Sequence, residues 1–173
     1  MKYATFLGKK MAQTEKAITL WERVLKRTDF TRIIEIGTFH GGFSIYLLLH
    51  TLGDRRKEFY TFDIINWRDY DHNPKIKNVL ELDKYFYKMD VFENIDFIKK
   101  IFSKRGINIL FCDGGDKEKE FNTFAPLMKP RDIIAVHDWG TEVHKENLNL
   151  DGFEEIFSNE CDEEGMTKFF KKI

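Results

Sequence analysis

Residues 33–44 read Ile-Ile-Glu-Ile-Gly-Thr-Phe-His-Gly-Gly-Phe-Ser, and the expected architecture of the chain is built around them. It begins with a short apolar run that is typical of a buried strand, and it continues into a turn with three glycines. Residues 43–50 then predict the first turns of an apolar helix. Glycines let the backbone approach a ligand closely, and the free N–H groups of a helix start face that ligand. The stretch therefore predicts a nucleotide-type cradle.

Composition limits the classes of protein to consider. The 173 residues are 42% hydrophobic and 33% charged, which predicts one soluble, compact domain of residues 1–173. With a formal charge of −1, the chain has no excess of positive charge that would indicate binding to nucleic acid or to an anionic membrane. The start lacks the apolar core of a signal peptide, and Cys112 within an apolar run favours a reducing compartment. We therefore expect a cytoplasmic protein with neither nucleic acid nor a membrane as partner.

Strands and helices alternate along the sequence. An N-terminal arm and helix occupy residues 1–30, with Thr14 as the helix N-cap, and residues 31–173 form the core. The expected strands are residues 32–36, 57–65, 85–89, 107–112, 132–136 and 166–173, the last as an edge strand. The expected helices are residues 15–28, 43–52, 91–102 and 116–128, with a polar tail over 141–165.

This alternation predicts an α/β fold: a Rossmann-like, doubly wound, mostly parallel sheet with helices on both faces, in a single domain. Such sheets bind ligands beyond the carboxyl ends of their strands. Each of the first five strands ends on or near an acidic residue: Glu35, Asp63, Asp90, Asp113 and Asp138. Acids gathered at one rim repel one another unless cations or hydroxyl groups satisfy them, so the rim is a candidate ligand site.

The stretch Glu-Ile-Gly-Thr-x-x-Gly-Gly-x-Ser, from Glu35 to Ser44, resembles the first motif of class I S-adenosylmethionine (SAM)-dependent methyltransferases. From about Gly8 onward the chain is similar to their metal-assisted O-methyltransferases, the group with catechol, macrolide-sugar and cephalosporin-hydroxylase-like members. In that group a glycine loop, an acid after the second strand and an acid after the third hold SAM. The resemblance implies these cofactor-binding residues: Gln13, Glu35, Gly37, Thr38, Gly41, Gly42, Ser44, Asp63, Asp90 and Asp113.

The same resemblance implies a divalent metal, Mg²⁺ or Mn²⁺, held by Asp113, His137 and Asp138. The group prefers an acid at the position of His137, and a histidine ligand shifts the preference from Mg²⁺ or Ca²⁺ towards Mn²⁺, Fe²⁺ or Zn²⁺. Asp113, Lys117 and His137 are the expected catalytic residues. Lys117 would stabilise the alkoxide of the acceptor or act as base, and His137 is an alternative base that needs no metal.

The sequence thus predicts methyl transfer from SAM to a hydroxyl group of a small molecule or sugar. A SAM-binding protein without transfer activity is the alternative, and a nicotinamide-dependent oxidoreductase is disfavoured because Phe39 stands where the dinucleotide fingerprint needs a second early glycine. Residues 66–84 are the least regular part, with Trp67 and Tyr70 as candidate parts of a lid and a short helix at 77–82. The oligomeric state stays open, a homodimer included.

Overall fold

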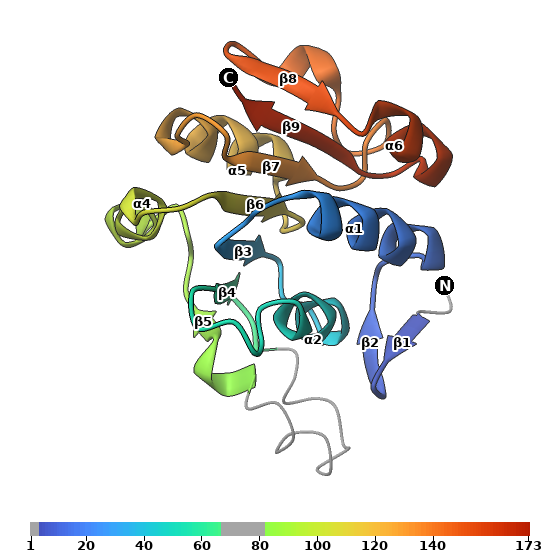
Figure 1. Ribbon diagram of the computed structural model, residues 1–173, viewed down its shortest axis with the longest axis vertical. Coiled ribbons are helices and arrows are strands. Elements are labelled where there is room, and N and C mark those ends of the chain that lie inside the picture. The colour runs from blue at the N-terminus through green and yellow to red at the C-terminus, as the bar shows by residue number, and fades with distance from the viewer. Residues whose placement is uncertain (1–3, 67–81) are drawn as a thin grey trace.

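A seven-stranded sheet forms the centre of the computed structural model, which describes residues 4–66 and 82–173 (Figure 1). Its strands are β3 (Arg32–Ile36), β4 (Glu58–Asp63), β5 (Phe86–Lys88), β6 (Asn108–Cys112), β7 (Ile133–Val136), β8 (Phe153–Ile156) and β9 (Lys168–Lys172). They lie in the order β5-β4-β3-β6-β7-β9-β8. The first five are parallel, and β9 runs antiparallel to both of its neighbours. The predicted doubly wound, mostly parallel sheet is confirmed.

Helices cover both faces of this sheet. On one face lie α1 (Glu15–Arg27), α2 (Gly42–Leu49) and α6 (Ser158–Glu164), and on the other α4 (Ile95–Ser103) and α5 (Lys117–Phe124). Short 3-10 turns are Leu82–Lys84, Ala125–Leu127 and Lys145–Asn147. Successive residues of β3 point to opposite faces, so Ile33 packs with α1 and α2 while Ile34 packs with α4 and α5. Within the described ranges, no helix is long and apolar enough to cross a membrane.

Helix α1 confirms the prediction from its apolar spacing. The hydroxyl of Thr14 caps the helix by accepting the backbone N–H of Ala17 at 3.1 Å. Its apolar stripe places Trp21 fully inside the core, where the ring packs edge-on against Phe111 and Phe169 with centroids 4.8 and 4.9 Å apart. These contacts fix α1 against the middle of the sheet.

The N-terminal arm, for which the sequence showed little periodicity, contains a hairpin of β1 (Ala4–Phe6) and β2 (Lys9–Met11). Strands of three residues are too short to display an alternating pattern. The hairpin lies against α2: a Cβ built on Gly42 would be only 2.5 Å from the carbonyl oxygen of Lys10. Gly42 is therefore required for the close approach of these two backbones.

Three further predictions need correction. The helix expected at 91–102 begins only at Ile95, because residues 91–93 form a turn after Asp90. The strand expected at the edge, β9, lies inside the sheet, because β8 from the supposedly polar tail pairs outside it. That tail also contains α6. The expected helix at 77–82 lies largely outside the described residues, and the lid candidates Trp67 and Tyr70 lie wholly outside them.

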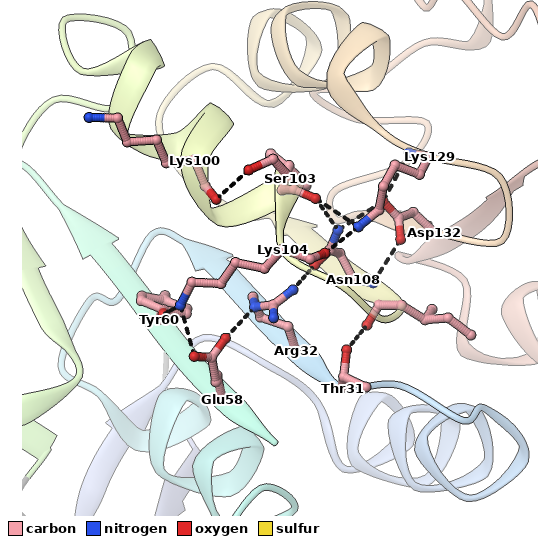
Figure 2. A network of polar contacts seen from close by, with 12 residues as sticks. Thr31, Arg32, Glu58, Tyr60, Lys100, Ser103, Lys104, Asn108, Lys129 and Asp132 are labelled. Atoms are coloured by element: carbon pink, nitrogen blue, oxygen red, sulfur yellow. Dashed lines mark hydrogen bonds and ion pairs between the residues drawn. The ribbon is translucent and has the colours of Figure 1, made fainter. Parts of the chain in front are cut away.

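A polar network joins the amino ends of four strands, at the end of the sheet away from the acidic rim (Figure 2). Arg32 on β3 pairs with Glu58 on β4 at 2.6 Å and donates to Asn108 on β6. The buried carboxylate of Asp132 accepts hydrogen bonds from the backbone N–H and side-chain amide of Asn108 and from the backbone N–H of Lys129. Most of these groups are buried, so each depends on its partner for hydrogen bonding.

We expect Asp132→Ala to lower the free energy of unfolding by about 3–5 kcal/mol, because it leaves three buried or half-buried N–H donors without their acceptor. Urea denaturation followed by circular dichroism measures the change. The matched control is Asp151→Ala, which removes an exposed aspartate before β8 and is expected to change stability by less than about 0.5 kcal/mol. Equal stability of the two variants would show that the network does not stabilise the fold.

Candidate functional site

A cleft of about 710 Å³ lies at the carboxyl ends of the parallel strands. The structure brings together there the residues that follow five different strands: Gly37 after β3, Asp63 at the end of β4, Asp90 after β5, Asp113 after β6, and His137 with Asp138 after β7. Lys117 at the start of α5 also lines the cleft. This is where open parallel sheets bind ligands.

The sequence predicts that the glycine turn lets the backbone approach a ligand, and the close contact that the structure shows at Gly37 is with the protein's own backbone. Gly37 has φ +98°, and a Cβ built on it would lie 2.2 Å from the carbonyl oxygen of Asp113, so only glycine fits. Gly41, with φ 82°, directly precedes α2. Phe39, which also has a left-handed backbone, donates its N–H to Asp63 at 3.0 Å. The turn after β3 is thereby tied to the end of β4.

Glu35 points into the protein. Its carboxylate is 1% exposed and accepts hydrogen bonds from the hydroxyls of Ser44 and Thr61, and Thr61 is in turn bonded to Thr38 at 2.6 Å. Of the predicted cofactor residues, Gly37, Asp63, Asp90 and Asp113 line the cleft, whereas Gln13, Glu35, Thr38, Gly41, Gly42 and Ser44 are not part of its lining. Glu35, Ser44 and Thr38 are instead joined through Thr61 in a buried hydrogen-bond network next to the glycine turn.

Burial raises the pKa of Glu35 to about 7, although the two hydroxyl donors oppose that shift. A glutamate in an unfolded chain titrates near 4.5, so folding takes up a proton at intermediate pH. The stabilisation from this group is therefore complete below the unfolded pKa and is lost as pH rises through the folded pKa.

As the pH rises from 5 to 8, the free energy of unfolding of the wild type should fall by about 2–3 kcal/mol relative to that of Glu35→Gln, because glutamine cannot ionise. Urea unfolding of both proteins at the two pH values, without SAM, measures this difference. A stability difference that does not change with pH would contradict the protonated, buried state of Glu35.

Asp63 and Asp90 are held in place by backbone N–H groups. Asp63 accepts from Phe39 and from Ile65, both at 3.0 Å, through different oxygens. Asp90 accepts from Phe92 at 2.8 Å and so caps a turn rather than the helix predicted at 91. Both carboxylates line the cleft, in positions fixed before any ligand arrives.

Gln13 reaches across from the segment before α1 and donates its side-chain amide to Asp113 at 2.7 Å. Because the amide nitrogen makes this bond, the amide oxygen Oε1 points away from Asp113, and it is buried without a hydrogen-bond partner. Gln13 is only 3% exposed, so this acceptor lacks compensation from bulk water.

Asp113, His137 and Asp138 offer ligand atoms that all lie within 4.8 Å of one another, which is compatible with a single metal ion. The group is possible because β6 and β7 are adjacent, as the metal prediction requires. Lys117 stands beside it, with Nζ 2.9 Å from Oδ2 of Asp138 and 2.8 Å from Glu142.

The electrostatics separate the roles of these groups. Burial alone would lower the pKa of Lys117, but Glu142 and Asp138 outweigh it and raise the pKa above its usual value. Lys117 is therefore a fixed positive charge, which favours the predicted alkoxide-stabilising role over the role of base. Burial raises the pKa of Asp113 well above its usual value and lowers that of His137.

The structure adds three residues that the sequence analysis missed. Glu120 on α5 lines the cleft and accepts the backbone N–H of Gly114 at 3.3 Å, and burial raises its pKa to about 7. Glu142 bonds Lys117, and Thr167 contacts His137. Glu120 could have been suspected from its helical spacing of three residues from Lys117, but no sequence signal pointed to the other two.

Comparison with known proteins shows the fold. No protein-family model matches the chain, and no curated protein does. Among solved structures, a Staphylococcus aureus protein assigned as a caffeoyl-CoA O-methyltransferase aligns with a TM-score of 0.66 at 11% identity, over 94% of this chain and 86% of that one. The chain has a class I methyltransferase fold.

Two further structures extend this comparison. The cmcI-N160 structure with SAH aligns with a TM-score of 0.60 at 12% identity, over 95% of this chain and 81% of that one. The [4+2]-cyclase SpnF aligns with a TM-score of 0.53 at 12% identity, over 99% and 87%. One methyltransferase-like fold thus occurs in proteins with different named activities, so the activity of this chain must be argued from its site.

Proposed function

We propose that the chain is a SAM-dependent methyltransferase that acts on a hydroxyl group of a small molecule or sugar. The observation that carries this proposal is the shared cleft: Gly37 of the glycine turn and the carboxylate of Asp63 line the same cavity as Asp113, Asp138 and Lys117. The first two suit a nucleoside, and the last three suit an ionising hydroxyl group.

Similar structures support SAM as the bound donor. The cmcI-N160 structure contains SAH, and a mutant of MtNAS, which aligns with a TM-score of 0.54 at 12% identity, contains SAM. In this chain, Asp63 would accept hydrogen bonds from the ribose hydroxyls and Asp90 would lie near the adenine. Gln13 does not line the cleft, so it would act on the bound donor only through Asp113, to which its side-chain amide donates.

The residues of the cleft would align and activate the acceptor. Bound SAM supplies an electrophilic methyl group, and holding two reactants in near-attack geometry lowers a barrier by about 7–11 kcal/mol. Lys117 would stabilise the negative charge that develops on the acceptor oxygen. A divalent ion on Asp113, His137 and Asp138 would lower the pKa of that hydroxyl when bound.

The donor set fits such an ion, since two carboxylates and an imidazole offer ligand atoms that all lie within 4.8 Å of one another. A metal-independent reaction is the second candidate, with His137 as base. It is favoured by the ammonium of Lys117, which already gives Asp138 a cationic partner at 2.9 Å. A SAM-binding protein without transfer activity is the third, and it is supported by the different activity named for one structure with this fold, a [4+2]-cyclase.

Incubation with methyl-labelled SAM and a panel of catechols, sugars and hydroxylated small molecules separates these candidates. Transfer that is lost with EDTA and restored by a divalent ion supports the metal-assisted enzyme. Transfer that is unchanged by EDTA supports His137 as base. Bound SAM with no transfer to any acceptor supports a binding protein. Cytoplasmic location and a homodimer remain proposals, for which fractionation and light scattering are the respective tests.

A further inference from the structure

His137 is held by a residue that is 30 positions away in sequence. The hydroxyl of Thr167 lies 3.1 Å from Nδ1 of His137, and Thr167 is completely buried. Its position is set by the end of α6, where the carboxylate of Glu164 accepts the backbone N–H groups of Met166 at 2.9 Å and of Thr167 at 2.6 Å. The backbone of Met166 also accepts the N–H of Trp139 at 2.9 Å. The segment before β9 therefore fixes the imidazole ring from behind.

Because Nδ1 contacts Thr167, Nε2 is the ring nitrogen on the side of Asp138. With Nδ1 at the hydroxyl of Thr167, Nε2 points towards Oδ1 of Asp138, 3.5 Å away. That distance is longer than an ordinary hydrogen bond, so Asp138 is not well placed to hold a proton on Nε2. When Nδ1 carries the proton and donates it to Thr167, the lone pair of Nε2 is free on the side of Asp138. Ring nitrogens that bind metals are commonly prepared in this way.

Lys117 and Gln13 approach the two aspartates through other atoms. Lys117 contacts Oδ2 of Asp138, whereas His137 faces Oδ1 of the same carboxylate. Gln13 contacts Oδ2 of Asp113. Lys117 and His137 therefore face different oxygens of the Asp138 carboxylate.

We propose that Thr167 is a positioning residue that presents Nε2 of His137 as a metal ligand, so that the group selects borderline ions such as Fe²⁺, Co²⁺ or Zn²⁺ over Mg²⁺ and Ca²⁺. Imidazole nitrogen suits the first ions, whereas Mg²⁺ and Ca²⁺ prefer oxygen ligands alone. The use of this ion in methyl transfer rests on the proposed function, but its binding does not.

Titration of the full chain with Co²⁺, without SAM, tests the proposal through the visible absorption of the bound ion. We expect one Co²⁺ per chain, and a large excess of Mg²⁺ should not displace it. His137→Asp supplies an oxygen ligand instead, so Mg²⁺ should displace Co²⁺ from that variant. A folded wild-type chain that binds no Co²⁺, or that releases it readily to Mg²⁺, would overturn the proposal.

The role of Thr167 is tested by two substitutions. Thr167→Val keeps the shape of the side chain but removes the hydroxyl, and we expect Co²⁺ affinity to fall about 10- to 100-fold. Thr167→Ser keeps the hydroxyl and should retain wild-type affinity. Equal Co²⁺ affinity of the valine and serine variants, with wild-type circular dichroism, would show that the hydroxyl of Thr167 does not position His137. Binding of labelled SAM by the metal-free protein is measured separately, so failure of the proposed function can be told apart from failure of this inference.

Discussion

Asp63→Ala is expected to weaken SAM binding about 100-fold. The carboxylate would accept two ribose hydroxyls, and charged hydrogen bonds contribute roughly 1.5–3 kcal/mol each, so losing both costs about 3 kcal/mol after partial compensation by water. The substitution also removes the acceptor of the Phe39 N–H, which ties the glycine turn to β4, and of the Ile65 N–H in the segment after β4. Equilibrium dialysis with labelled SAM measures the dissociation constant directly.

The matched control for this variant is Asp96→Ala, which removes an exposed aspartate at the start of α4, outside the lining of the cleft. It changes the net charge equally, so it should bind SAM like the wild type. If Asp63→Ala bound SAM as tightly as Asp96→Ala, the ribose would lie elsewhere, and the assignment of the β4 end as the nucleoside site would fail.

Asp113→Ala is expected to reduce the rate of methyl transfer by about 10²- to 10³-fold while SAM binding changes far less. Asp113 lies at the centre of the proposed reaction site, where it belongs to the metal-compatible group and also holds Gln13. Single-turnover transfer from labelled SAM to the acceptor found in the panel measures the rate, and dialysis measures affinity.

Two outcomes would contradict this role for Asp113. Unchanged transfer would exclude both the metal and the acceptor function of the carboxylate. A loss of SAM affinity as large as the loss of rate would place Asp113 in the cofactor site alone. Asp96→Ala again serves as the control for a lost negative charge.

Much of the fold could be predicted because its signals are local. The apolar run before Gly37 and the stripe that contains Trp21 gave a strand and a helix, and the alternation of elements gave the parallel sheet. The hairpin at residues 4–11 and the inner position of β9 could not be predicted. They depend on pairing between distant or very short segments, which leaves little periodicity in the sequence.

The site shows the same division. Acids at strand ends were visible in the sequence, since the sheet rule brings such positions together. The inward turn of Glu35 was not, because it depends on the hydroxyls of Ser44 and Thr61. The contact between Thr167 and His137 was also hidden, because the end of α6 carries Thr167 to the ring from 30 residues away.

The cleft at the carboxyl ends of β3, β4 and β6 is the proposed SAM site. Equilibrium dialysis of the wild-type chain with labelled SAM, with competition by unlabelled SAH and separately by NAD⁺, measures binding there. We predict one SAM per chain, displaced by SAH and not by NAD⁺. A folded chain that retains no SAM at about 1 mM, or that releases it equally to NAD⁺, would show that this cleft is not a SAM site.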